Sequence, residues 1–315
     1  MKWDQRKWCS RLKKTGLALV RIYFLLFAIL ILFQGYVVFP GQWMVFPSLR
    51  HSFLEKYLEP CSRTFHVNGE TLEGWVKHVP GTPLIVFLGG NGEDVAWHVP
   101  FLDGMGCSFL TVNYRGFGNS SGSPSEQALI DDAIVLIDQV CGKMDIPSGE
   151  VVLVGQSIGS GVAVAVASKR PPGKLVLQVP FDSLEAVAKE KLPVYPVSWI
   201  LRSPFRSDLL APAITCPVAV FAALEDEVIP VHHARRIASL FPQLICYREF
   251  DGVHHMELED AYGFERAFRN FCLGERDRNL TFVQKGKYIE PSWFSGKNIV
   301  SDSDCLLSRP CCFWY

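Results

Sequence analysis

Short apolar runs recur along the chain from about Cys61 to Phe250 and alternate with segments of helical periodicity. Such runs are typical of strands in a sheet that helices cover on both faces. Because strands alternate with helices, we expect right-handed crossovers and a mostly parallel sheet of about eight strands. The predicted strands span residues 64–67, 72–78, 84–88, 108–113, 151–154, 175–179, 218–222 and 244–250.

Local turn and capping signals refine this pattern. Asn68-Gly69 separates the first two strands, so these should form an antiparallel hairpin. The clearest helix is predicted over residues 124–140, with Ser123 as its N-cap, Pro124 in its first turn and Glu126 completing a capping box. Further helices are expected directly after Ser157 and over residues 231–240 and 257–271.

An apolar segment of a different kind precedes this domain. Residues 17–39 are interrupted only by Arg21, Gln34 and Gly35. As a helix the segment would be about 34 Å long, enough to cross the hydrocarbon core of a bilayer, which is about 30 Å thick. We therefore predict a transmembrane anchor over residues 17–39, between a basic leader (residues 1–16) and a connector (residues 40–60).

Basic residues gather before the anchor, which predicts its orientation. By the positive-inside tendency the N-terminus should stay in the cytoplasm, with the folded domain on the non-cytoplasmic side. A cleaved signal peptide is the alternative, but no A-x-A-like site follows the apolar core. The basic residues are Lys2, Arg6, Lys7, Arg11, Lys13 and Lys14 before the anchor, against Arg50 and Lys56 in the stretch that follows it.

The pentapeptide Gly155-Gln156-Ser157-Ile158-Gly159 joins the predicted strand 151–154 to a predicted helix. A serine in this place sits in a sharp, strained turn, and flanking glycines leave room for it. The turn lifts the hydroxyl above the sheet, and the helix N-terminus behind it favours developing negative charge. Ser157 is therefore the candidate nucleophile, and the Ile158 amide is a candidate oxyanion donor.

An activated serine needs a base within hydrogen-bond reach and an acid that orients the base. The loop after strand 218–222 offers Asp226 as the acid, with Glu225 and Glu227 as rivals. The loop after strand 244–250 offers two adjacent histidines, which cannot point the same way from one turn.

Of these two histidines, His254 is favoured as the base because it follows the permissive Gly252 by two residues, and His255 is the alternative. The second oxyanion donor should come from the glycine-rich loop after strand 84–88. Glycines allow the backbone to approach a substrate closely, and we choose the Asn91 amide, with Gly90 as its rival.

Together these motifs resemble the α/β-hydrolase superfamily over residues 61–273. The chain looks closest to its membrane-anchored members, which include lysophospholipase-like and protein-depalmitoylase-like serine hydrolases. The resemblance rests on the Gly90-Asn91 loop, the stretch N-Y-R-G-F-G-N-S-S-G-S-P-S-E at residues 113–126, the serine pentapeptide, Asp226 with Ile229-Pro230, and the late histidine. It implies the α/β-hydrolase fold, the chain order serine, acid, histidine, and Asp226 as the acid.

Three positions depart from the pattern of that family. Gly89 stands where such proteins usually carry a histidine, and Ala222-Ala223 stand where a glycine commonly precedes the acid loop. His255 stands where a polar residue, often asparagine, is usual, which leaves the choice between the two histidines open.

The resemblance implies a membrane-anchored serine hydrolase that cleaves a carboxylic ester or thioester of a lipid-like acyl group through an acyl-enzyme. Residues 181–211 form an insertion where this fold carries a cap, and their aromatic and aliphatic side chains suit an acyl chain or a membrane surface. A cap helix that only packs on the domain would have the same composition. The alternative functions are a serine peptidase with the same triad and a non-catalytic scaffold.

Composition bears on partners and cofactors. A net charge of -1 and a pI near 6.7 offer no electrostatic reason to expect nucleic acid. The ten cysteines form no C-x-x-C pair and no Cys/His cluster with ligand spacing, so we expect no metal and no other cofactor. Beyond Gly274 the periodicity stops, so residues 274–315, with Cys311 and Cys312, are expected to form a loosely packed tail.

Overall fold

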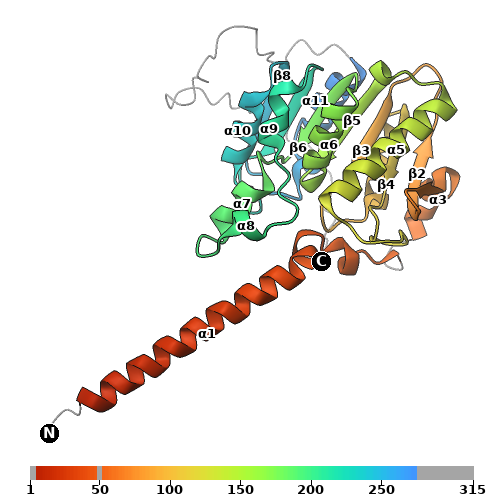
Figure 1. The fold of residues 1–315 in the computed structure, drawn as a ribbon. Helices are drawn as coiled ribbons and strands as arrows, with labels where there is room; N and C mark the ends of the chain where they lie inside the picture. Colours follow the sequence, from red (N-terminus) through yellow and green to blue (C-terminus); the bar gives the residue numbers. More distant parts are fainter. Residues whose placement is uncertain (1–4, 48–51, 275–315) are drawn as a thin grey trace, which may run out of the picture. The chain divides into compact units, whose positions relative to one another are not determined.

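A computed structural model describes residues 5–47 and 52–274 (Figure 1). The start of the basic leader, and the predicted tail beyond Gly274 with Cys311 and Cys312, lie outside the described residues. The described part contains one eight-stranded sheet in the order β1-β2-β4-β3-β5-β6-β7-β8. Its strands are β1 (Ser62–Val67), β2 (Glu70–Lys77), β3 (Leu84–Leu88), β4 (Ser108–Val112), β5 (Val151–Gln156), β6 (Lys174–Gln178), β7 (Val218–Ala223) and β8 (Leu244–Phe250).

The topology confirms the predicted fold class. β2 runs antiparallel to both β1 and β4, and every other strand pair is parallel. All residues of β3, β4, β5 and β7 are buried, as expected of strands covered on both faces. The carboxyl ends of the parallel strands therefore meet at one edge of the sheet, where the loops that carry the candidate site begin.

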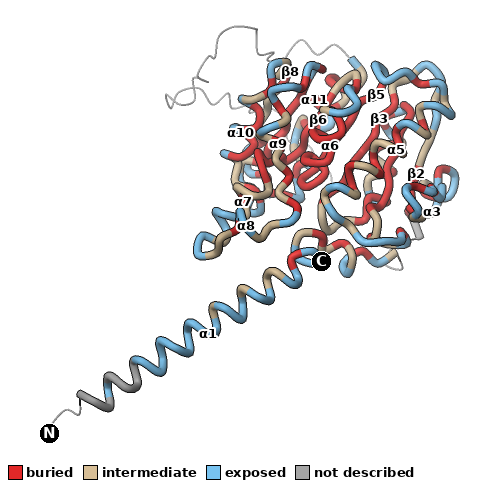
Figure 2. The backbone as a smooth tube through the Cα atoms, in the orientation of Figure 1, coloured by how far each residue is buried: buried red, intermediate tan, exposed pale blue. Residues whose placement is uncertain are grey.

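Helices pack on both faces of the sheet (Figure 1), and the buried residues gather in the strands and in the helices against them, α6 above all (Figure 2). Short 3-10 turns join several elements. The helices are α1 (Gln5–Val38), α2 (Gly41–Met44), α3 (Ser52–Cys61), α4 (Val99–Gly104), α5 (Glu126–Met144), α6 (Ile158–Lys169), α7 (Leu184–Lys191), α8 (Val197–Ile200), α9 (Ser207–Leu210), α10 (Val231–Leu240) and α11 (Phe264–Leu273). The 3-10 turns are η2 (Val95–His98), η3 (Ser148–Glu150), η4 (Ala211–Ala213) and η5 (Leu258–Asp260).

Alternating side chains of each central strand feed two separate cores. In β3, Val86 belongs to the core that also contains side chains of α5, α6 and α10, whereas Phe87 belongs to the core that contains side chains of α3, α4 and α11. The period of two along a strand produces this division, since successive side chains point to opposite faces. Because both faces are apolar, the sheet holds its register between the two helical layers.

Two helix starts differ from the predictions. The predicted N-cap Ser123 is wrong: α5 begins after Ser125, whose Oγ accepts a hydrogen bond from the Ala128 amide at 3.2 Å. The Glu126 carboxylate does not return to a cap, because it accepts from the Phe205 amide at 2.9 Å. The helix predicted from residue 257 starts only at α11, since Gly263 adopts a left-handed φ of +77° and separates η5 from α11.

The N-terminal helix contains the predicted anchor and also joins the domain. Its stretch Lys13–Val38 is long and apolar enough to cross a membrane, and no residue of its most apolar window is buried. Directly after α1 the chain becomes part of the core, because Phe39 is buried against Phe205, with ring centroids 6.4 Å apart. The Gly41 amide also donates to the Asn91 carbonyl oxygen at 2.9 Å. The end of the anchor is thus packed into the domain.

Candidate active site

Ser157 alone connects β5 to α6, and its backbone has φ of +52° and ψ of −118°. A residue other than glycine adopts such a conformation only where its surroundings impose it. A Cβ at Gly155 would collide with the carbonyl oxygen of Gly159, and a Cβ at Gly159 would collide with that of Leu88. The strained turn predicted from the pentapeptide is therefore formed, and both glycines are required by close backbone contact.

The Ser157 hydroxyl lies at the end of a hydrogen-bonded row of three side chains. His255 Nε2 is 3.0 Å from Ser157 Oγ, and His255 Nδ1 is 2.6 Å from Asp226 Oδ2. All three residues are buried. Because an ionised carboxylate only accepts hydrogen bonds, Nδ1 carries the imidazole proton and Nε2 is left to accept the proton of the serine.

Asp226 is held in place by its own loop. Its Oδ1 accepts hydrogen bonds from the amides of Val228 and Ile229 at 2.9 and 2.6 Å, which leaves Oδ2 for His255. Neither rival carboxylate pairs with the His255 ring: Glu225 is exposed, and Glu227 contacts the His254 ring and the His255 backbone amide. The structure therefore brings the predicted acid and the predicted nucleophile to the same histidine.

That histidine is His255, the alternative base, and not His254, which the sequence favours. The His254 side chain is 52% exposed and pairs with Glu227 at 3.2 Å, a hydrogen bond that raises its pKa. The reason is alternation along the loop, because Val253 and His255 both point inward and His254 between them points outward. His255, the alternative base, makes the contacts of a general base.

The amides of the two predicted oxyanion donors make no hydrogen bond to another described residue. Ile158 is the first residue of α6, so its amide has no partner within the helix. In the loop after β3 the rival Gly90 donates its amide to the Glu93 carboxylate. The Asn91 amide has no hydrogen-bond partner among residues 5–47 and 52–274, and the Asn91 side chain donates to the Val38 carbonyl oxygen at 3.3 Å.

Comparison with known proteins decides the family. A sequence profile of the alpha/beta hydrolase family matches residues 85–284. The chain belongs to this family. This hydrolase is 32% identical to an uncharacterized protein of Mycobacterium tuberculosis over 212 residues, covering 65% of this chain and 75% of that protein. It is 29% identical to lysophosphatidylserine lipase ABHD12 of Xenopus tropicalis over 213 residues, covering 58% of this chain and 53% of that protein.

Solved structures agree on the fold. An alpha-beta hydrolase from Vibrio vulnificus superposes with a TM-score of 0.59 at 16% identity, covering 76% of this chain and 90% of that one. Est1E from Butyrivibrio proteoclasticus superposes with a TM-score of 0.55 at 12% identity, covering 67% of this chain and 97% of that one. At these identities the likeness shows the fold alone.

The hydrolase also contains an ion-pair cluster that sequence analysis missed. Glu93 Oε2 lies 3.2 Å from His98 Nε2, and His98 Nδ1 lies 3.0 Å from Glu259 Oε2. A Cβ at Gly89 would collide with the Glu93 carboxylate. Glycine in place of the histidine usual in the family therefore makes room for Glu93 beside the oxyanion loop. No local pattern reveals this cluster, because Glu259 joins it from the far end of the chain.

Charge holds the cluster together. Burial lowers the pKa of His98, but the neighbouring Glu259 and Glu93 outweigh burial and raise that pKa well above its ordinary value. Burial raises the pKa of Glu93, yet His98 and the Gly90 amide lower it on balance. The two glutamates therefore favour the charged form of His98, and Glu93 ties the cluster to the loop that carries Asn91 through the Gly90 amide.

We predict that His98→Gln destabilises the hydrolase by about 3 kcal/mol, because it removes the cation between two largely buried carboxylates. The raised pKa of His98 makes its stabilisation complete below about pH 6.5 and lost as the pH rises through the raised value. The lowered pKa of Glu93 makes its stabilisation present above pH 4.5, its ordinary pKa, and lost as the pH falls.

The difference between wild type and His98→Gln should therefore be largest near about pH 6 and shrink on both sides of it. Urea unfolding in detergent at a series of pH values measures the difference, with His66→Gln at an exposed histidine of β1 as the control. A difference that grows steadily from pH 6 to pH 10 would contradict the assignment of charges.

Proposed function

We propose that this chain is a membrane-anchored serine hydrolase that cleaves the carboxylic ester or thioester of a lipid-like acyl group. The observation that carries the proposal is the hydrogen-bonded row of Ser157, His255 and Asp226, with the Ile158 amide directly after Ser157 at the start of α6. Nucleophile, base, acid and oxyanion donors then come from four loops at one edge of the sheet.

In the proposed reaction Ser157 Oγ attacks the carbonyl carbon while His255 Nε2 takes the hydroxyl proton. The Ile158 and Asn91 amides donate to the oxyanion of the tetrahedral intermediate, and one such donor contributes about 3 kcal/mol. Collapse of the intermediate expels the alcohol or thiol, which leaves with the proton from His255, and the acyl group stays on Ser157. Water, deprotonated by His255, then releases the acid. Asp226 holds Nδ1 and stabilises the imidazolium in both steps.

Contacts between the cap and the anchor support a lipid substrate. The Tyr195 ring stacks on the Tyr23 ring of α1 at 5.1 Å, and Tyr23 Oη donates to the Val194 carbonyl oxygen at 3.0 Å. Further along α1, the Gln34 amide holds the backbone of Ile200 and Arg202 at 3.0 and 2.8 Å. A cap fastened to a membrane-spanning helix would receive its substrate from the bilayer.

The exposed side chains of the cap fit the same surroundings. Trp199 is 89% exposed and Val194 is 68% exposed, although both are apolar. Indole rings favour the boundary between lipid and water, and exposed apolar side chains beside an anchor are suited to a lipid phase. The name of the relative ABHD12, lysophosphatidylserine lipase, supports a substrate of this class.

The orientation of the anchor belongs to the same proposal. The basic leader keeps the N-terminus in the cytoplasm and places the hydrolase domain on the non-cytoplasmic side.

Activity on a panel of lysophospholipids, long-chain acyl thioesters, short soluble esters and peptide amides tests the proposed function. We expect turnover of the long-chain esters or thioesters, with Ser157→Ala and His255→Ala each lowering kcat by about 10⁴-fold or more. His254→Ala is the matched control, because its side chain points away from Ser157, and it should stay within a few-fold of wild type.

Selective turnover of the peptide amides would favour a serine peptidase instead. A folded wild-type chain that turns over no member of the panel would favour a scaffold. Loss of activity in His254→Ala with retention in His255→Ala would contradict the proposed base.

Protease protection in sealed vesicles tests the orientation. We expect the domain to resist protease added to the cytoplasmic face and to become sensitive after the vesicles are opened with detergent. Digestion of the domain from the cytoplasmic face of intact vesicles would reverse the topology.

A further inference from the structure

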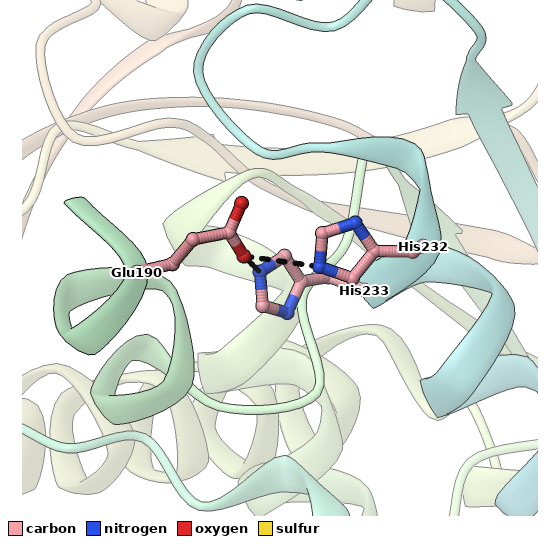
Figure 3. Close-up of side chains that lie close together, drawn as sticks. All are labelled: Glu190, His232 and His233. Carbon is pink, nitrogen blue, oxygen red and sulfur yellow. Dashed lines mark hydrogen bonds and ion pairs between the residues drawn. The ribbon is translucent and has the colours of Figure 1, made fainter.

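Glu190, His232 and His233 converge outside the candidate active site (Figure 3). Glu190 Oε2 lies 3.1 Å from His232 Nε2 and 3.3 Å from His233 Nε2. Glu190 lies in the last turn of α7 in the cap, and both histidines lie in the first turn of α10. None of the three side chains contacts the Ser157, His255 and Asp226 row, so their arrangement needs a separate explanation.

His233, the buried member of this cluster, is oriented as a metal ligand would be. His233 is only 4% exposed, and its Nδ1 lies 2.7 Å from Asp182 Oδ1. Because the carboxylate accepts, Nδ1 carries a proton, and Nε2, which faces Glu190, is the nitrogen that a metal ion could bind. This Nε2 is buried without a hydrogen-bond partner among the described residues, since its contact with Glu190 lacks hydrogen-bond geometry. A carboxylate on the far nitrogen is the usual support of a metal-binding histidine.

The spacing of the donor atoms suits zinc. At bond lengths of about 2.0–2.1 Å, neighbouring ligand atoms of a tetrahedral zinc ion lie about 3.3 Å apart. The two distances from Glu190 Oε2 are 3.1 and 3.3 Å, and all three donor atoms lie within 4.8 Å of one another. His232 and Glu190 are exposed, so small rotations of their side chains can close the set around an ion.

The cations near the cluster are engaged elsewhere. Lys191 Nζ donates to the Glu227 carbonyl oxygen at 2.8 Å, and Lys189 pairs with Glu185 at 2.6 Å. Arg236 pairs with the second oxygen of Asp182 at 3.2 Å. No lysine or arginine among the described residues therefore pairs with the Glu190 carboxylate, which contacts only the two histidines.

We propose that Glu190, His232 and His233 bind one Zn²⁺ ion, with Asp182 orienting His233 and water in the fourth position. The ion would fasten α7 of the cap to α10, which begins shortly after the loop of Asp226. The sequence predicted no metal because its cysteines lack ligand spacing, and this cluster has no local signature because Glu190 and His232 are 42 positions apart. The site is independent of the proposed acyl transfer, so either assignment can fail alone.

Zinc binding by the full chain in detergent, purified without a histidine tag and freed of metal, tests the site. We expect one Zn²⁺ per chain by equilibrium dialysis. Glu190→Ala and His232→Ala should each weaken binding by about 10-fold or more, and Asp182→Asn by about 10- to 100-fold. Both ligand variants lie at exposed positions, so they should keep the fold of the wild type.

Two matched histidine variants distinguish this site from adventitious binding. His66→Ala removes an exposed histidine of β1, and His254→Ala removes the one beside Glu227; neither should change the affinity. Hydrogen exchange provides a second readout, since zinc should slow exchange in α7 of the wild type but not of Glu190→Ala.

Stoichiometric binding that survives both Glu190→Ala and His232→Ala would overturn the proposal. Loss of the site in His254→Ala, or a wild-type chain that binds no zinc at micromolar concentrations, would overturn it as well. In the last case the cluster would be a pair of ordinary contacts between histidines and a carboxylate.

Discussion

The candidate site depends on one constraint, the contact between the turn at Ser157 (residues 155–159) and the end of β3. Gly159 lies so close to the Leu88 carbonyl oxygen that no side chain fits between them, and Gly155 lies as close to Gly159. This packing fixes the strained Ser157 backbone and brings the start of α6 beside the loop after β3. The close approach of the two backbones, which glycine alone allows, therefore places the loop that carries Asn91 next to the start of α6.

The parallel sheet extends this constraint to the other side chains. β6 and β7 lie between β5 and β8, yet the loops after β5, β7 and β8 leave the same edge. Asp226 and His255 consequently meet Ser157 although about 70 and 98 positions separate them from it along the chain. The Leu224 and Glu225 amides donate to the carbonyl oxygens of Phe250 and Val253, which ties the acid loop to the histidine loop.

The N-terminal helix α1 is joined to this arrangement. Phe39 fills the core beside Phe205, and Val38 and Gly41 hold the Asn91 side chain and carbonyl oxygen. The cap also contacts α1 through Tyr195 and Tyr23. The loop that carries Asn91 is thus held by residues at and just after the end of α1, and the cap contacts α1 nearer its middle. The stretch Lys13–Val38 of this helix is long and apolar enough to cross a membrane.

Much of this arrangement followed from local sequence, and the rest required the fold. The apolar runs predicted the strands, and the pentapeptide predicted the turn at Ser157, because period and glycine spacing are local properties. The choice between His254 and His255 depended on which way one loop turns. Val253 is buried in the core that also contains Phe87, so alternation along the loop turns His254 outward and His255 inward.

The long-range clusters could not be predicted at all from local sequence. Glu93, His98 and Glu259 form one ion-pair cluster, and Glu190 joins the two histidines of α10, across gaps that no spacing rule connects. The N-cap at Ser125 was missed for a similar reason, because Glu126 is engaged by the distant Phe205 amide.

Reaction with a fluorophosphonate, followed by mass spectrometry of the peptides, tests the central claim most directly. The account predicts one phosphonyl adduct, located on Ser157, formed rapidly in the wild type and far more slowly in His255→Ala. A folded wild-type chain that stays unmodified, or that carries the adduct on another residue, would contradict it.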